Sequence, residues 1–257
     1  SSVAITNAAG VQNSFVNVGD NVSVTATFSE VVNVDNSSGN PTITLAVGSD
    51  NRTATYTSGS GSDDLVFRYT IQSGDNDTNG ISIRADALDD NSSTIRDAAH
   101  NDANLTHDTV PDNSSVKVDT TAPSVDNFTM SDTELKIGDN ATVTLVFSEA
   151  VIEFSNADIT IPNLDNSTPT GTLTTMTSDD NETWRGTFTP ATNAEDNSSR
   201  LSLGTSYTDL AGNNGPARQT ANYEVETLAP TVSSVAITNA AGVQNSFVNV
   251  GDNVSVT

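Results

Sequence analysis

The sequence predicts an all-β chain built from β-sandwich domains in tandem. Apolar and polar residues alternate with a period of two in several stretches, and clusters of Asn, Asp, Gly and Ser separate these stretches. No stretch shows a convincing helical period. The length of 257 residues suits two domains, because a domain usually takes roughly 100 to 200 residues.

The strand patterns recur in both halves of the chain. In residues 22–28, Val, Ala and Phe alternate with Ser and Thr, and residues 65–71 alternate in the same way. Residues 141–147 and 183–188 repeat the pattern. A period of two places one face of each strand in the core. Segments such as residues 58–64 favour turns, because Gly and Asn tolerate positive φ and Asp caps its own backbone.

A long exact repeat indicates a tandem array. Residues 1–25 recur letter for letter as residues 233–257, at an offset of 232 (233 − 1). Self-similarity at a fixed period is typical of arrays. We therefore interpret the chain as one period plus the opening of the next, cut from a longer polymer.

A weaker internal repeat divides the period into two related domains. Residues 19–30 read GDNVSVTATFSE and residues 138–149 read GDNATVTLVFSE. Each domain ends in a similar proline-bearing segment, VDTTAP at residues 118–123 and VETLAP at residues 225–230. The predicted segments are a β-sandwich at residues 1–119, a second at residues 120–228, and the start of the next repeat at residues 229–257.

The composition excludes several partners and chemistries. The chain has 33 acidic and 9 basic side chains, whereas nucleic acid and anionic membranes need clustered Lys and Arg. It has no cysteine, which excludes disulfides, thiolate nucleophiles and cysteine metal sites. No apolar run approaches the roughly 20 residues of a membrane span. We therefore expect that the protein does not bind nucleic acid and that this segment does not insert into a membrane. The expected partners are neighbouring repeats of the same chain and, in a fibre or layer, neighbouring chains.

Four motifs in combination resemble a known family. They are GDNVSVTATFSEVV at residues 19–32, RTATYTSGSGSDDLVFRYTIQSGDNDTNGISI at residues 52–83, VDTTAP at residues 118–123 and DLAGN at residues 209–213. Together they resemble the bacterial immunoglobulin-like (Ig-like) repeats of giant cell-surface adhesins, including biofilm-associated and RTX-type adhesins. The resemblance covers nearly the whole chain. It implies tandem Ig-like β-sandwich domains, an extracellular location at the cell surface, a spacer role, and calcium near domain junctions.

The sequence departs from that pattern in two places. Residues 97–101 read DAAHN, with His100 where the second domain has Gly212, so we expect an altered turn in the first domain. DNSS or DNST also recurs where short glycine turns are expected. These tetrapeptides begin at Asp35, Asp90, Asp112, Asp165 and Asp196.

A first candidate calcium site lies at residues 75–86. Asp75, Asp77 and Asn79 precede a glycine, and Asp86 follows after five further residues. Alternating oxygen side chains and a glycine turn can surround one Ca²⁺ ion, with the Ile81 carbonyl as a further ligand. The alternative is a polar hairpin turn, because the flanking helices of an EF-hand are absent.

A second candidate lies at the domain junctions, where acidic residues from three motifs are expected to meet. The predicted ligands are Asp119 or Glu226, Glu30 or Glu149, and Asp97 or Asp209. Repulsion among such acids destabilises the compact state unless a cation bridges them. A bridging ion would also stiffen the linker. The alternative is that solvated acids only keep the surface soluble.

Asn-x-Ser/Thr sequons are more frequent than chance predicts. They indicate candidate N-glycosylation sites, in addition to the two candidate calcium sites. They occur at Asn21, Asn36, Asn51, Asn76, Asn91, Asn104, Asn113, Asn127, Asn140, Asn166, Asn181 and Asn197, with Asn253 repeating Asn21. Low complexity in Asn, Ser and Thr is the alternative explanation.

Catalysis finds little support in the sequence. The only histidines, His100 and His107, lie in a polar stretch without a nucleophile motif, and we expect both to be solvated loop residues. Trp184 falls on the apolar phase of its strand, where core packing is favoured over an exposed carbohydrate platform. We therefore predict that the protein is not an enzyme.

The leading hypothesis is a structural repeat unit of an extracellular adhesin or surface fibre, acting as a calcium-stiffened spacer. An alternative is a glycosylated surface-layer or self-assembling filament subunit, in which residues 1–6 would pair with a neighbour by strand addition. A second alternative is a glycan- or surface-binding module.

Overall fold

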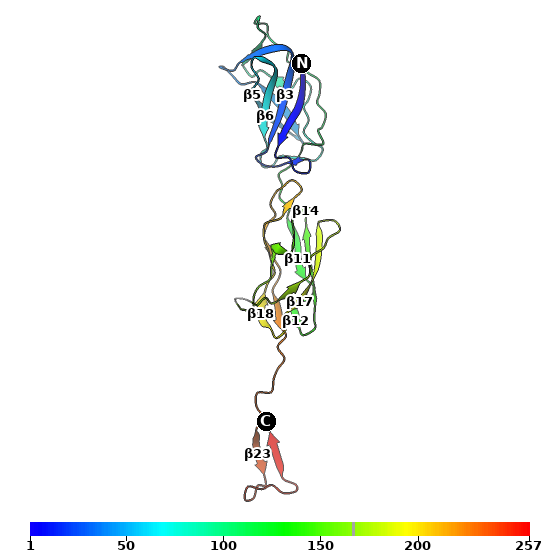
Figure 1. Cartoon of the computed structure of the whole chain (residues 1–257), viewed down its shortest axis with the longest axis vertical. Helices are drawn as coiled ribbons and strands as arrows, with labels where there is room; N and C mark the ends of the chain where they lie inside the picture. Colours follow the sequence, from blue (N-terminus) through cyan, green and yellow to red (C-terminus); the bar gives the residue numbers. More distant parts are fainter. Residues whose placement is uncertain (166–167) are drawn as a thin grey trace.

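In the computed structural model, which describes residues 1–165 and 168–257, the chain forms two β-sandwich domains and a C-terminal hairpin placed end to end (Figure 1). The described residues contain no α-helix and one short 3-10 turn, Asn156–Asp158. No described helix is therefore long and apolar enough to cross a membrane. The all-β prediction is confirmed.

The first domain packs two sheets against each other. The larger sheet has the order β1-β3-β6-β5-β4-β8, with β9 also paired to β3, and the smaller has the order β2-β10-β7. The strands are β1 (Ser2–Ala9), β2 (Phe15–Val16), β3 (Asn21–Asp35), β4 (Thr42–Val47), β5 (Asp50–Ser58), β6 (Ser62–Thr70), β7 (Asn76–Asp77), β8 (Leu88–Asp89), β9 (Thr94–Arg96) and β10 (Lys117–Asp119).

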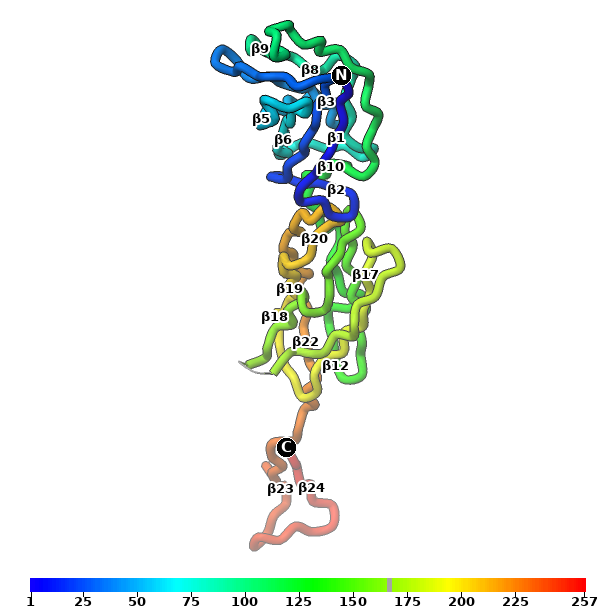
Figure 2. Tube along the Cα trace, turned by 45° about the horizontal axis from the view of Figure 1, so that its top comes forward, coloured from blue at the N-terminus to red at the C-terminus, as the bar shows by residue number. Residues whose placement is uncertain are grey.

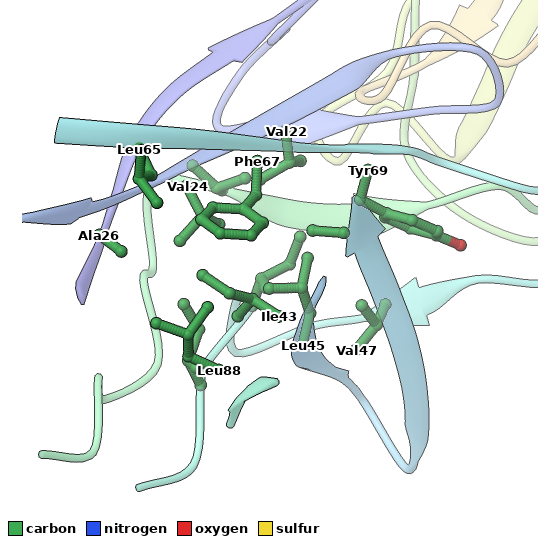
Figure 3. Packing of buried hydrophobic residues seen from close by; sticks show 14 of the residues in the cluster. Val22, Val24, Ala26, Ile43, Leu45, Val47, Leu65, Phe67, Tyr69 and Leu88 are labelled. Carbon is green, nitrogen blue, oxygen red and sulfur yellow. The ribbon is translucent and has the colours of Figure 1, made fainter. Parts of the chain in front are cut away.

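The predicted alternation is what fills this core. Val22 and Val24 of β3 are 0% exposed, while Ser23 between them and Thr25 after them are half-buried on the other face. Phe67 of β6 pairs with Val24 across the sheet and packs against Ile43 and its neighbours (Figure 3). Burying such apolar surface is the main favourable term in folding.

The second domain repeats this plan with shorter strands. Its main sheet has the order β11-β13-β17-β16, and smaller sheets join β12-β22-β18, β15-β19-β21 and β14-β20. The strands are β11 (Val125–Met130), β12 (Glu134–Lys136), β13 (Ala141–Phe147), β14 (Val151–Ile152), β15 (Ile159–Thr160), β16 (Gly171–Leu173), β17 (Thr183–Pro190), β18 (Glu195–Ser199), β19 (Ser202–Leu203), β20 (Thr208–Asp209), β21 (Arg218–Gln219) and β22 (Tyr223–Glu226).

The aromatic core of the second domain includes Trp184. Its ring is partly buried and packs edge-on against Phe154 at a centroid distance of 4.8 Å. Its indole N–H donates to the Asn181 carbonyl at 3.1 Å. Trp184 therefore packs as its strand phase predicts.

The C-terminal hairpin, β23 (Ile237–Ala241) and β24 (Asn253–Val256), repeats the start of the first domain. Ala240 faces Val254 in it, as Ala8 faces Val22 in the first domain. The pairing is thus encoded locally in these residues. Val254 is 45% exposed, whereas Val22 is 0% exposed. The hairpin forms the same register, but no second sheet covers its apolar face.

Candidate metal centre at the domain junction

Three carboxylates meet where the first domain joins the second. Asp119 ends β10 of the first domain, Glu149 follows β13, and Asp209 lies in β20. One carboxylate oxygen of each lies within 4.8 Å of the others. We call this group the junction triad. It is the one group of three or more His, Asp or Glu residues with such spacing among residues 1–165 and 168–257.

The Asp209 side chain is oriented by the turn that it closes. Its Oδ1 accepts from the backbone N–H of Ala211 at 2.8 Å and of Asn213 at 2.9 Å, and its Oδ2 accepts from the Asn213 amide at 2.9 Å. The same amide donates to the carbonyls of Asp119 at 3.1 Å and Thr121 at 3.4 Å. Asn213 thus ties the turn to the linker. Sequence reasoning did not assign it this role, although its place in the DLAGN motif was a signal.

Two further asparagines of the first domain hold the junction. The Asn13 amide donates to the Leu210 carbonyl and the Asn17 amide donates to the Ala211 carbonyl, each at 2.9 Å. In Figure 2, β2 accordingly lies beside β20. No sequence signal indicated these contacts, because they join residues almost 200 positions apart.

The junction triad concentrates negative charge without a basic partner. Burial, reinforced by Asp119 and Asp209, raises the pKa of Glu149 from 4.5 to about 7. Burial also raises the pKa of Asp119, and Asp209 adds to this shift. The salt bridges within the described part of the chain involve Arg52 or Arg96, not the triad. Mutually repelling carboxylates of this kind are suited to a divalent cation, and Ca²⁺ takes six to eight oxygen ligands.

We expect the chelated protein to lose stability as the pH rises toward 8. The folded-state pKa of Glu149 lies near 7 and its ordinary value is 4.5, so the folded state binds more protons between these values. Protonation of Glu149 therefore contributes fully to the stability of the folded state at a pH below the pKa of the unfolded state. This contribution is lost as the pH rises through the pKa of the folded state. Urea unfolding of wild type and Glu149→Gln across this range measures the effect. Parallel pH profiles for the two proteins would contradict it.

The equivalent turn of the first domain keeps its shape despite His100. Asp97 Oδ1 accepts from the N–H of Ala99 at 2.9 Å and of Asn101 at 2.8 Å, as in the second domain. His100 adopts φ +66° where Gly212 has φ +86°. The expectation of an altered turn was therefore wrong. The side-chain bonds to Asp97 offset the cost of a left-handed residue.

The remaining predicted junction acids lie at the free ends of the two domains. Glu30 and Asp97, with Ser1, line an opening of about 380 Å³ at the end of the first domain away from the second. Glu226 ends β22, where the chain leaves the second domain. In this chain, Glu30 and Asp97 thus line the same opening, and Glu226 lies apart from them in the second domain.

The residues of the first candidate site have separate protein partners. Asp75 is buried and accepts from the Arg52 guanidinium, the Tyr69 hydroxyl and the Gln72 N–H. The structure uses this carboxylate in an ion pair and hydrogen-bond network, not in an open loop.

The other members of that candidate set are also engaged. Asp77 accepts from the N–H of Gly80 at 2.8 Å and of Gly48 at 2.8 Å, which closes the predicted turn. The Asn79 amide donates to Asp112. The Ile81 carbonyl accepts from the N–H of Asn113 at 3.0 Å, and Asp86 accepts from that of His107 at 3.1 Å. The structure therefore does not gather Asp75, Asp77, Asn79, Ile81 and Asp86 into one ligand set.

His107 is buried, which corrects the expectation of a solvated loop residue. Only 6% of its surface is exposed. Its Nε2 accepts from the Ala87 N–H at 2.9 Å and its Nδ1 lies 2.8 Å from the Asp108 carbonyl. Both ring nitrogens thus have backbone partners, and this makes burial of the imidazole ring tolerable.

Most of the predicted acceptor asparagines are at the surface. Asn21 and Asn113 are half-buried, and Asn166 lies outside the described residues. The exposed ones are Asn36, Asn51, Asn76, Asn91, Asn104, Asn127, Asn140, Asn181, Asn197 and Asn253.

The comparison with protein families agrees with the sandwich architecture. The family model of the bacterial Ig-like domain matches residues 119–225. No curated protein matches the sequence. Among solved structures, FdeC, an adhesin of Escherichia coli, is 11% identical to this chain at a TM-score of 0.32. The match covers 93% of this chain and 67% of the FdeC chain. A chimeric titin Z1Z2 tandem is 15% identical at a TM-score of 0.26, covering 84% and 94%.

The surface-layer protein SbsC, domains 4–9, is 13% identical at a TM-score of 0.25. The match covers 92% of this chain and 33% of that one. The chain thus consists of tandem Ig-like β-sandwich domains, the second of which matches the bacterial Ig-like domain family.

Proposed function

We propose that this chain is a structural repeat unit of an extracellular adhesin or surface fibre and acts as a calcium-stiffened spacer. The observation that carries the spacer role is the end-to-end placement of the two domains, followed by a hairpin that restarts the first domain (Figure 1). An array of this kind gains length with every period, and each domain contacts only its neighbours. The proposed role of this chain is to add length to the array, and this role involves no catalytic step.

The calcium part of the proposal is supported by the junction triad. Its carboxylates come from both sides of the domain boundary, so one bound ion would connect the linker to the second domain. An ion there would replace carboxylate repulsion with attraction, which favours one relative orientation of the domains. At the boundary between periods, Glu226 would meet the next copies of Glu30 and Asp97 in the same way.

A calcium titration tests this proposal. We expect isothermal titration calorimetry of the 257-residue chain to show one Ca²⁺ site. The Glu149→Gln substitution should abolish the heat of Ca²⁺ binding. Glu226→Gln is the matched control, because Glu226 is an exposed acid with no triad in this chain. Binding that survives Glu149→Gln, or no binding at all, would contradict the site.

A glycosylated surface-layer or filament subunit is the second candidate. The exposed sequons favour it, in particular Asn91 and Asn181, which lie in turns at positive φ. We expect mass spectrometry of native material to find glycan on the peptides that carry these two asparagines. Unmodified peptides at both positions would reject this candidate.

A further inference from the structure

The chain leaves both domains in the same way. In the first linker, the Thr121 N–H donates to Asp119 at 2.9 Å. In the second linker, the Leu228 N–H donates to Glu226 at 3.1 Å. The linkers VDTTAP and VETLAP therefore start in the same local conformation.

The strands next to the two linkers also correspond. Val16 of β2 pairs in parallel with Val118, and Leu135 of β12 pairs in parallel with Val225. The residue after each is at the end of its domain, so Lys136 takes the place in the second domain that Asn17 has in the first.

In the first domain, this surface receives a turn of the second domain. The Asn17 amide donates to the Ala211 carbonyl, and the Asn213 amide donates to the carbonyls of Asp119 and Thr121. The turn at residues 209–213 thus lies between β2 and the linker.

The second domain carries an equivalent groove of about 490 Å³. It is lined by Lys136, Ile137, Glu226, Leu228, Ala229 and Pro230, which we call the exit groove. Its surface is mainly apolar, with Ile137 66% and Leu228 50% exposed.

A turn equivalent to residues 209–213 is present in the first domain. Residues 97–101 form the same hydrogen bonds as residues 209–213, and they lie at the end of the first domain that a preceding period would meet. Asn101 holds the position of Asn213. Its amide would reach the carbonyls of Glu226 and Leu228.

The two junctions differ in a complementary way. The loop between β1 and β2 of the first domain has five residues, 10–14, and the loop between β11 and β12 of the second domain has three, 131–133. The longer loop includes Gln12, which lies so close to Gly212 that a Cβ there would be 2.7 Å from its amide nitrogen.

In the first junction, a side chain at Gly212 would therefore have to displace the amide end of Gln12. At the second junction the loop at residues 131–133 is shorter, so we expect no counterpart of Gln12 to meet that position of the turn. The first-domain turn carries His100 there. The larger side chain thus belongs to the turn that would face the shorter loop.

We propose that the exit groove is the docking surface for the turn at residues 97–101 of the following period. The array then has two alternating kinds of rigid junction, one closed by Asn13, Asn17 and Gly212, the other by the exit groove and His100. The inference rests on the proposed tandem array, but not on calcium at the junction triad.

Distances between spin labels test the inference in a longer chain. The chain is continued after Thr257 with residues 26–119, which completes a third domain. Because the protein has no cysteine, Asp63→Cys and Thr175→Cys, both at exposed positions, can be labelled selectively. Pairing Thr175→Cys with Asp63→Cys of the first domain reports the first junction, and pairing it with Asp63→Cys of the third domain reports the second.

In calcium, we expect a narrow distance distribution at both junctions. Ile137→Asp, at an exposed position of the exit groove, and Asn101→Ala in the third domain should each remove the narrow peak at the second junction and leave the first unchanged. Asn213→Ala is the matched variant for the first junction.

A broad second junction beside a narrow first one would overturn the docking inference and leave the proposed function intact. A narrow second junction that neither variant broadens would also overturn it. Broad distributions at both junctions would instead contradict the proposed stiff spacer.

Discussion

Asp75→Ala is expected to lower the free energy of unfolding of the first domain by about 3 kcal/mol or more, because removing one partner of a buried ion pair costs about 3 to 5 kcal/mol. The Asp75 side chain is 0% exposed and that of Arg52 is 30% exposed. Burial acts to raise the pKa of Asp75, but hydrogen bonds from Tyr69, Gln72 and Arg52 outweigh it and lower the pKa overall. The substitution leaves these donors without their acceptor.

Urea unfolding followed in calcium and in chelator measures this loss. We expect the same loss in both conditions, because the carboxylate is bound to protein donors. Asp63→Ala, an exposed acid on β6, is the control and should change stability little. If Asp75→Ala abolished a calcium-induced stabilisation, Asp75 would be a calcium ligand, as the spacing of residues 75–86 suggested.

Saturating Ca²⁺ is expected to raise the Tm of the second domain by about 10 °C or more. An ion at about 100 times its Kd stabilises the folded state by about 2.7 kcal/mol, and 1 kcal/mol corresponds to about 4 to 8 °C for a domain of this size. Glu149 and Asp209 lie in the second domain, so that domain gains most. Calorimetric scans in millimolar Ca²⁺, Mg²⁺ and chelator measure the shift.

Two variants, Glu149→Gln and Glu226→Gln, test whether the junction triad causes this rise in Tm. Glu149→Gln should raise the Tm in chelator, because it removes repulsion, and should lose the calcium response. Glu226→Gln should retain the response. A wild-type Tm that is equal in calcium and in chelator, or a response retained in Glu149→Gln, would rule out the junction triad as the source.

The fold could be predicted from the sequence because strand alternation is a local property. Val22 and Val24 are buried where their phase predicts, and the hairpin at residues 237–256 reproduces the register of residues 5–24 without its domain. The two sheets and their order depend on non-local pairing and required the structure.

The candidate site could be predicted in part. Matching motifs in the two domains indicated two alternatives at each of three positions, and the structure places one of each, Asp119, Glu149 and Asp209, within 4.8 Å of one another. Calcium at this position stays a prediction. The same motifs could not reveal Asn13 and Asn17, whose partners lie in the other domain.

The loop at residues 75–86 shows why spacing alone is insufficient. Its Asp and Asn residues have the spacing of a calcium loop, but Arg52 and Tyr69 from β5 and β6 bond to Asp75. Residues far apart in sequence decide whether a carboxylate is free. The burial of His107 likewise depends on the backbone N–H of Ala87, twenty positions away.

The central claim is that a cation fixes the angle between the domains, and the width of one distance distribution tests it most directly. Labels at Asp63→Cys and Thr175→Cys report the first junction of the 257-residue chain. The account predicts a narrow distribution in calcium that broadens in chelator, and a distribution in Glu149→Gln that calcium does not narrow. Equal widths in calcium and in chelator would contradict it.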